Sequence, residues 1–80
     1  MGTRDYRERN PFCEVRDCLQ RFVQVHHIRT KGAGGSDDDK NLVTLCAEHH
    51  TKIHGLGWRT FIRLYPSIER KIRSAHEVPR

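Results

Sequence analysis

Two short pairs of cysteine and histidine residues restrict how this chain can fold. Four residues separate Cys13 from Cys18, and two residues separate Cys46 from His49. Four ligands of these types satisfy the tetrahedral coordination of a structural zinc ion. The spacing therefore predicts a Cys3His zinc site, here called the zinc knuckle, that joins a turn near the N-terminus to a segment in the middle of the chain. The alternative is that Cys13 and Cys18 are free thiols and that Cys46 is a small buried apolar residue.

The composition explains why a bound metal would stabilise this chain. The chain has 80 residues, of which 35% are hydrophobic and 31% are charged. A single domain of this size and polarity buries little apolar surface, so a bound metal would add folding free energy. Three cysteines cannot all pair with one another, and the nearby histidines favour metal ligation in a reducing compartment. Because no apolar run approaches the roughly 20 residues of a membrane helix, we expect a cytoplasmic protein that does not span a membrane.

The first half of the chain has the pattern of an arm followed by a hairpin. The polar, arginine-bearing residues 1–12 indicate a flexible arm. Residues 19–28 alternate in character as a strand does, and residues 42–45 form a second, short apolar strand. Between them, residues 30–41 have the glycine, serine and aspartate content of a loop.

The second half is predicted to be helical. A helix should begin at Ala47 and end near Gly55 or Gly57. From Trp58 onward, apolar residues recur at three- and four-residue spacing, which is typical of an amphipathic helix that packs on the preceding unit. Pro66 interrupts this pattern and predicts a kink or a boundary between two helices. The fold class is therefore α+β.

Five of the six histidines lie between positions 26 and 54. On the predicted helix, His50 and His54 share one face, whereas His49 points about 100 degrees away from His50. Adjacent residues of a strand point to opposite sides, so His26 and His27 are suited to different tasks. We expect His26, His50 and His54 to form an open three-histidine site for a divalent metal. The alternative for any single histidine is a surface or core imidazole.

His27 remains outside this site and is a candidate general base, because a neutral imidazole with a pKa of about 6.5 can accept a proton from water. Asn41, at the start of the second strand, is placed to supply an amide hydrogen bond to the His27 region. The run Asp37, Asp38 and Asp39 offers hard-cation ligands, but its place in the glycine-rich loop favours a solvated turn.

These motifs together resemble the HNH endonuclease family. The resemblance rests on HHI at 26–28, the glycine-rich loop, NLVTLC at 41–46, the histidine pair at 49–50 and His54. It implies the ββα-metal, or His-Me finger, fold, with residues 13–56 as the nuclease core and residues 57–80 as a helical region that packs on this core within a single domain.

The resemblance also implies roles for individual residues. His26 would be the first metal ligand, His27 the general base, and Asn41 the residue that constrains the base and its loop. His50 would be the ligand at the final motif position, and His54 matches an additional ligand found in some members. Cys13, Cys18 and Cys46 resemble the family's accessory zinc knuckles.

This chain departs from the common form of the family at three points. His49 stands where the fourth cysteine is usual, four residues rather than two separate Cys13 from Cys18, and many relatives have aspartate in place of His26. Three neutral imidazoles hold transition metals well, so the catalytic metal could be Mg²⁺, Mn²⁺, Ni²⁺ or Zn²⁺, beside a structural Zn²⁺.

The charge distribution suits DNA as a partner. The formal net charge is +5, and basic residues outnumber acidic ones six to two after Gly57. Phosphate contacts of this kind give affinity with little sequence information. The candidates near the catalytic motif or in the C-terminal region are Arg29, Lys31, Lys52, Arg59 and Arg63.

The sequence therefore predicts a bacterial or phage-encoded, metal-dependent DNA endonuclease that nicks DNA or cuts both strands with weak specificity. A long target site would require a homodimer or a separate specificity protein, such as a phage partner. The alternatives are a non-catalytic, zinc-stabilised module that binds nucleic acid and a zinc adaptor for protein partners.

Overall fold

The computed structural model describes residues 3–77, apart from the side chain of Lys31. Its helices and strands are α1 (Thr3–Arg9), β1 (Val23–His27), β2 (Leu42–Cys46), α2 (Ala47–Leu56), α3 (Trp58–Leu64) and α4 (Glu69–Glu77). Short 3-10 turns lie at Lys31–Ala33, Asp39–Asn41 and Pro66–Ile68. The predicted α+β class is confirmed, and the hairpin followed by α2 is consistent with the ββα fold. Within residues 3–77, none of the helices has the length and apolar character needed to cross a membrane.

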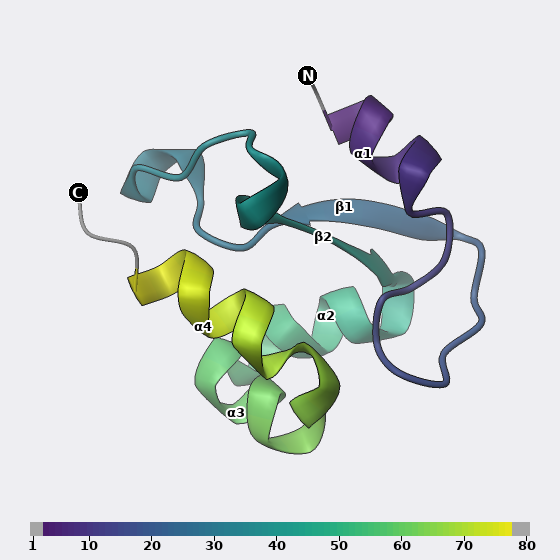
Figure 1. The fold of residues 1–80 in the computed structure, drawn as a ribbon. Helices are drawn as coiled ribbons and strands as arrows, with labels where there is room; N and C mark the ends of the chain where they lie inside the picture. The colour runs from purple at the N-terminus through teal and green to yellow at the C-terminus, as the bar shows by residue number, and fades with distance from the viewer. Residues whose placement is uncertain (1–2, 78–80) are drawn as a thin grey trace.

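The two strands form an antiparallel hairpin at the centre of the molecule. Val23 pairs with Cys46 and His27 pairs with Leu42. α1 lies on one side of the hairpin, and α2, α3 and α4 lie on the other (Figure 1). All five residues of β2 are buried, which explains why this strand reads as a nearly continuous apolar run rather than an alternating one. The end of β2 leads directly into α2, so Cys46 and the histidines of α2 lie close together in the chain.

The end of α2 depends on one glycine. Gly55 lies within the helix, whereas Gly57 follows its last residue with a φ of 85°. The Gly57 backbone N–H donates to the carbonyl of Ile53 at 3.0 Å. Because this left-handed conformation is costly for residues with a Cβ, glycine is favoured at position 57, where α2 ends and the next residue begins α3.

The C-terminal region forms two helices rather than one. α3 ends at Leu64, Pro66 begins a 3-10 turn, and α4 begins at Glu69, as the missing proline N–H requires. Phe61 and Ile72 are fully buried, and they join one apolar cluster with residues of the hairpin and α2. This cluster holds α3 and α4 against the unit that carries the metal-ligand candidates.

The N-terminal arm differs from the prediction. Residues 1–12 were expected to be flexible, but residues 3–9 form α1, and Tyr6 is only 2% exposed. The Tyr6 hydroxyl donates to Glu14 at 2.5 Å and accepts from Lys71 of α4. Burial and the Glu14 carboxylate both raise the pKa of Tyr6 above its usual value. α1 is therefore part of the folded domain, because its one aromatic residue, Tyr6, is hydrogen-bonded to Glu14 and to Lys71 of α4.

We expect Tyr6→Ala to lower the free energy of unfolding by about 3 kcal/mol, because it removes a buried ring and leaves Glu14 without its hydroxyl partner. Chemical denaturation measures this change. The matched control on the same helix is Arg4→Ala, whose side chain is 89% exposed and whose loss should change stability by less than about 0.5 kcal/mol. Equal denaturation midpoints for the two variants would show that α1 does not anchor to the domain.

Candidate functional site

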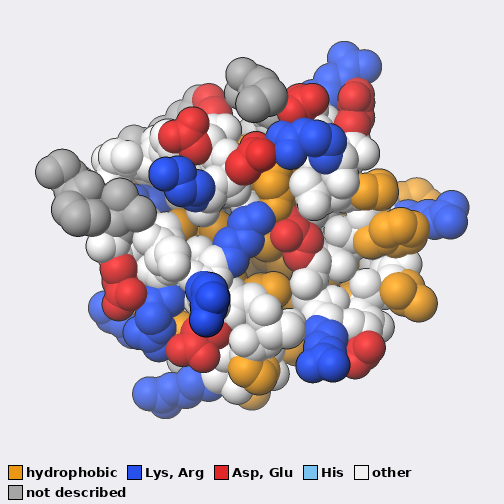
Figure 2. Space-filling model, in the orientation of Figure 1, with side chains coloured by type: hydrophobic (Ala, Val, Ile, Leu, Met, Phe, Trp, Pro, Cys, Tyr) orange, Lys and Arg blue, Asp and Glu red, His pale blue; other side chains and the backbone are white. Residues whose placement is uncertain are grey.

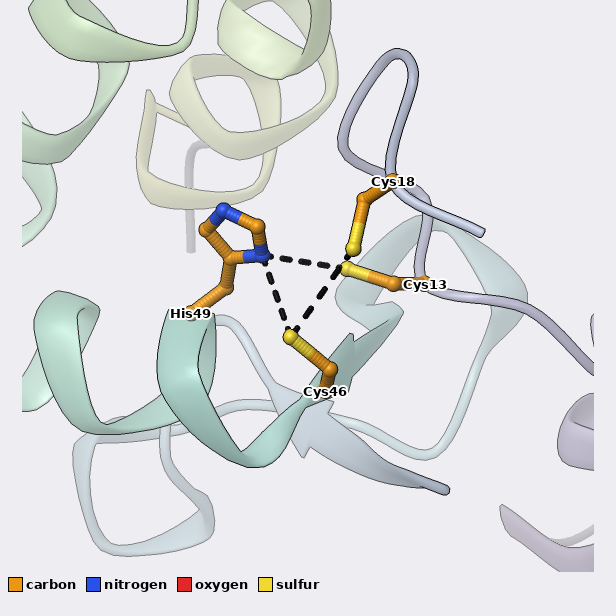
Figure 3. A group of neighbouring side chains, drawn as sticks. All are labelled: Cys13, Cys18, Cys46 and His49. Carbon is orange, nitrogen blue, oxygen red and sulfur yellow. Dashed lines mark hydrogen bonds between the residues drawn. The ribbon is translucent and has the colours of Figure 1, made fainter. Parts of the chain in front are cut away.

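The predicted zinc knuckle is assembled from three segments. Cys13 and Cys18 lie in the turn before β1, Cys46 ends β2, and His49 lies in the first turn of α2 (Figure 3). The His49 Nδ1 atom is 3.4 Å from the Cys13 Sγ atom and 3.2 Å from the Cys46 Sγ atom. The Sγ atoms of Cys18 and Cys46 are 3.9 Å apart. All four ligand atoms lie within 4.8 Å of one another.

These distances fit a tetrahedral zinc ion. Bonds of about 2.3 Å to sulfur and about 2.0 Å to nitrogen place neighbouring sulfurs about 3.8 Å apart and a sulfur about 3.5 Å from a nitrogen. The sulfur atoms are too far apart for a disulfide, and all three cysteines are free. The turn between Cys13 and Cys18 includes Asp17 at a φ of 66° and is closed by a hydrogen bond from the Cys18 N–H to the Val15 carbonyl. The wider cysteine spacing is thus compatible with a closed site.

The knuckle is also buried. Cys13 and Cys46 are 5% and 4% exposed, and the edge of the His49 ring packs against Tyr65 with centroids 4.8 Å apart. Burial raises the pKa of the Cys13 thiol to about 11, although backbone hydrogen bonds involving Cys46 and Val15 act in the opposite direction. A buried thiolate at Cys13 therefore needs a nearby cation, which a divalent metal would supply.

A second group of ligand candidates comes from β1 and α2. The ring nitrogens of His26, His50 and His54, here called the three-histidine group, lie within 4.8 Å of one another. The Nε2 atoms of His50 and His54 are 3.1 Å apart, close to the roughly 3.3 Å between two ligands of one tetrahedral ion. The His26 ring lies 5.2 Å and 5.1 Å from the other two ring centroids. The structure thus brings together the three residues that the spacing singled out.

Two of the three imidazoles, His26 and His50, are held in the neutral form that binds metals. Burial, followed by the nearby His50 and His54 rings, lowers the pKa of His26 to about 4. Burial and then His54 lower the pKa of His50 as well. Neutral imidazoles can donate a lone pair to a cation without first losing a proton, so this group fits a divalent metal.

His27 leaves β1 on the side opposite to His26, as strand geometry requires. Its Nε2 atom is 2.7 Å from the Oδ1 atom of Asp37 in the loop between the strands. The two side chains are 27% and 41% exposed, so the pair lies at the surface rather than in the core. Asp37 was predicted to be part of a solvated turn, and its contact with His27 was not predicted from the sequence.

Asn41 closes the loop between the strands. Its Oδ1 atom accepts from the Arg29 N–H at 2.8 Å, and its Nδ2 group donates to the carbonyls of Arg29 and Ser36 at 2.9 Å and 2.7 Å. The Asn41 carbonyl also accepts from the Ile28 N–H at 2.8 Å. The side chain is predicted to constrain the loop that follows His27, and these bonds join both ends of that loop through its backbone.

Gly35 is required where the loop folds back on itself. A Cβ atom at this position would stand 1.7 Å from the Arg29 carbonyl oxygen and 2.8 Å from the Asn41 Nδ2 atom. We expect Gly35→Ala to displace the loop and to lower the free energy of unfolding by about 2 kcal/mol, measured by thermal or chemical unfolding. Gly32→Ala is the matched control in the same loop, because a Cβ there meets nothing within 4 Å. Equal stability of the two variants would contradict the closed loop.

The five residues predicted to contact DNA do not lie on one element. Arg29 lines a 120 Å³ cavity together with Asn41 and the glycine-rich loop, and the Arg59 guanidinium lies 4.9 Å from the Trp58 ring centroid. Arg63 is exposed on α3, and the Lys31 side chain is outside the described part of the chain. The Lys52 ammonium group donates a hydrogen bond to the Tyr65 hydroxyl at 3.0 Å, so it already has a partner within the protein.

His76 is the sixth histidine, and its sequence context predicts no role for it. Its ring stacks on Trp58 with centroids 4.3 Å apart. Burial, Arg29 and Arg59 lower its pKa, in that order, so both arginines act on this part of α4. Figure 2 shows that lysine and arginine side chains are spread over the visible face, with acidic side chains among them. The basic charge therefore does not gather in one patch on that face.

Comparison with known proteins agrees with this arrangement. A curated relative, the probable mobile endonuclease E of Enterobacteria phage T4, is 36% identical over 53 residues. The matched segment covers 66% of this chain and 35% of that relative, so the chain spans about a third of its length. No solved structure matches the chain significantly. The model of the HNH endonuclease family matches residues 13–55, which include the hairpin, the zinc knuckle and the three-histidine group. More than half of the chain is covered by this match, and the chain therefore belongs to the HNH endonuclease family.

Proposed function

We propose that this chain is a metal-dependent DNA endonuclease that hydrolyses phosphodiester bonds, by nicking or by weakly specific cleavage of both strands. The observation that carries the proposal is that two adjacent histidines at the end of β1, His26 and His27, face different groups of side chains. His26 joins two histidines of α2 in a group that fits a metal, whereas His27 points away from that group to Asp37. A candidate metal site and a candidate base thus occupy consecutive residues.

The proposed roles follow from this arrangement. His26, His50 and His54 would hold a divalent cation, which supplies positive charge for the scissile phosphate and the leaving 3′ oxygen. His27 accepts a proton from the attacking water as its oxygen bonds to phosphorus and the bond to the 3′ oxygen breaks. Asn41 keeps the loop after His27 closed. Imidazole ligands suit Mn²⁺, Ni²⁺ and Zn²⁺ better than Mg²⁺, and a structural Zn²⁺ is assigned to the knuckle.

DNA contacts are proposed for the five basic residues named from the sequence, with Arg29 and Arg59 the best supported. Both contribute to the lowered pKa of His76, and His76 makes the smallest contribution to the lowered pKa of His26, so their charges reach the three-histidine group. Backbone phosphates would bind there without base readout. Recognition of a longer DNA target would need a second copy of the chain or a separate partner. We place the activity in the cytoplasm of a bacterium or phage-infected cell.

Plasmid cleavage tests this proposal. We expect supercoiled DNA to be nicked or linearised when Mg²⁺, Mn²⁺, Ni²⁺ or Zn²⁺ is added to protein whose three-histidine group has been stripped of metal. His50→Ala should lose both metal affinity and cleavage, whereas Thr51→Ala, an exposed neighbour on α2, should keep both. Salt-sensitive DNA binding without cleavage under all four metals would refute the endonuclease and favour the non-catalytic binding module.

A further inference from the structure

Three consecutive aspartates in the loop between the strands have three different partners. Asp38 exchanges hydrogen bonds of 3.2 Å with Ser36, and Asp39 forms a two-bond pair with Arg9 of α1 at 2.9 Å. Asp37 alone of the three contacts His27, at 2.7 Å. The direction of each carboxylate is set by the loop backbone, which Asn41 closes. The contact between Asp37 and His27 is therefore a product of the fold rather than of a general excess of acidic residues.

The chemistry of this contact fixes the state of the imidazole. An ionised carboxylate has acceptors only, so the proton in the hydrogen bond belongs to the Nε2 atom of His27. A neutral imidazole carries one proton, and with Nε2 protonated its Nδ1 atom keeps a lone pair. The carboxylate thus selects one of two tautomers and restricts rotation of the ring.

We propose that Asp37 is a positioning residue for cleavage, which holds the Nε2–H of His27 and leaves Nδ1 to accept the proton from water. The proposal rests on the endonuclease function proposed above. The Asp37 carboxylate also stabilises the imidazolium that forms once His27 has taken the proton, because the hydrogen bond then joins two groups of opposite charge. Asp37 itself contacts neither metal nor DNA in this role.

The activity test uses Asp37→Asn, which keeps the size of the side chain and loses its charge. We expect kcat to fall by about tenfold or more, with KM for DNA and the affinity for added Mn²⁺ little changed. Asp38→Asn is the matched control, because the Asp38 carboxylate accepts a hydrogen bond from Ser36. This variant should cleave DNA at the native rate. In the His27→Ala background, Asp37→Asn should cause no further loss. A native kcat for Asp37→Asn, or an equal loss in the His27→Ala background, would overturn the proposal.

A second measurement does not depend on activity. Long-range ¹H–¹⁵N correlation spectra of the zinc-loaded full chain report which nitrogen of His27 carries the proton. We expect the Nε2–H tautomer in the native chain and in Asp38→Asn, and a mixture of tautomers in Asp37→Asn. A native spectrum with the proton on Nδ1 overturns the positioning role even if the protein cleaves DNA. If the protein never cleaves DNA, the endonuclease proposal fails while the tautomer assignment is still decided by the spectrum.

Discussion

His27→Ala is expected to lower the rate of DNA cleavage by about 100-fold to 10,000-fold, which is the usual contribution of a positioned general base. The side chain is partly exposed and points away from the three-histidine group. Its removal should therefore leave the fold and both metal sites intact. Single-turnover cleavage with saturating metal measures the rate, and calorimetric titration with Mn²⁺ measures the retained metal affinity.

The neighbouring residue provides the contrast. His26→Ala removes a member of the three-histidine group, so it should weaken metal binding, and added metal should restore part of its activity. His27→Ala should show the reverse pattern, with native metal affinity and a rate that no metal concentration restores. If His27→Ala cleaved DNA as fast as the native chain, the assignment of His27 as the base would be wrong. If it lost metal, the two adjacent histidines would not have separate roles.

The metal-ligand candidates could be placed from sequence because their relations are local. His50 and His54 share a face in any α-helix, and a strand turns His26 and His27 to opposite sides. Only one long-range step, the pairing of β1 with β2, is then needed to bring His26 to α2. The functional roles of these residues stay predictions, because the structure tests their proximity and not their chemistry.

The N-terminal helix shows what local patterns cannot reveal. The pairs Arg4 with Glu8 and Asp5 with Arg9 have the spacing of helical ion pairs, at 3.6 Å and 2.9 Å. Such pairs contribute only a few tenths of a kcal/mol, and a helix this short is not stable alone. Tyr6 supplies the missing stability through Lys71, which lies 65 residues further along the chain. No periodicity within residues 1–12 encodes that contact.

Asp37 illustrates the same limit at the candidate site. The two residues that follow it, Asp38 and Asp39, are also aspartates, so residue type cannot identify the one that faces His27. The backbone of the loop determines which aspartate faces His27. The path of this backbone depends on the hydrogen bonds of Asn41 and on the close approach of Gly35 to Arg29. A solvated turn was a sound expectation from composition, but the closed loop turns one of its carboxylates toward the candidate base.

Loss of zinc from the knuckle should have the largest effect on the fold. We expect Cys13→Ser to bind less than one zinc per chain and to be largely unfolded at 25 °C. Structural zinc contributes about 10–16 kcal/mol of apparent binding free energy in small zinc domains, whereas whole domains are stable by about 5–15 kcal/mol. Elemental analysis measures the bound zinc, and far-ultraviolet circular dichroism with thermal unfolding measures the fold.

The control for Cys13→Ser is a ligand change at the other site. His54→Ala removes a member of the three-histidine group on the exposed side of α2, so it should keep the knuckle zinc and the native melting temperature while losing affinity for added metal. A Cys13→Ser chain that melts with the native chain would show that the apolar cluster suffices for folding. The free-thiol alternative for the cysteines would then be correct.

The pH dependence of zinc affinity separates the same alternatives without a substitution. The raised pKa of Cys13, about 11, means that this thiol is protonated at neutral pH before metal binds. Zinc binding must therefore release its proton, and the affinity should rise as pH increases and fall as pH decreases. Zinc-derived stability is then present at neutral pH and is lost on acidification, because protons compete with the metal for the sulfur atoms. Calorimetric titrations in buffers of different ionisation enthalpy count the released protons, and a count of zero would mean that Cys13 does not bind zinc as a thiolate.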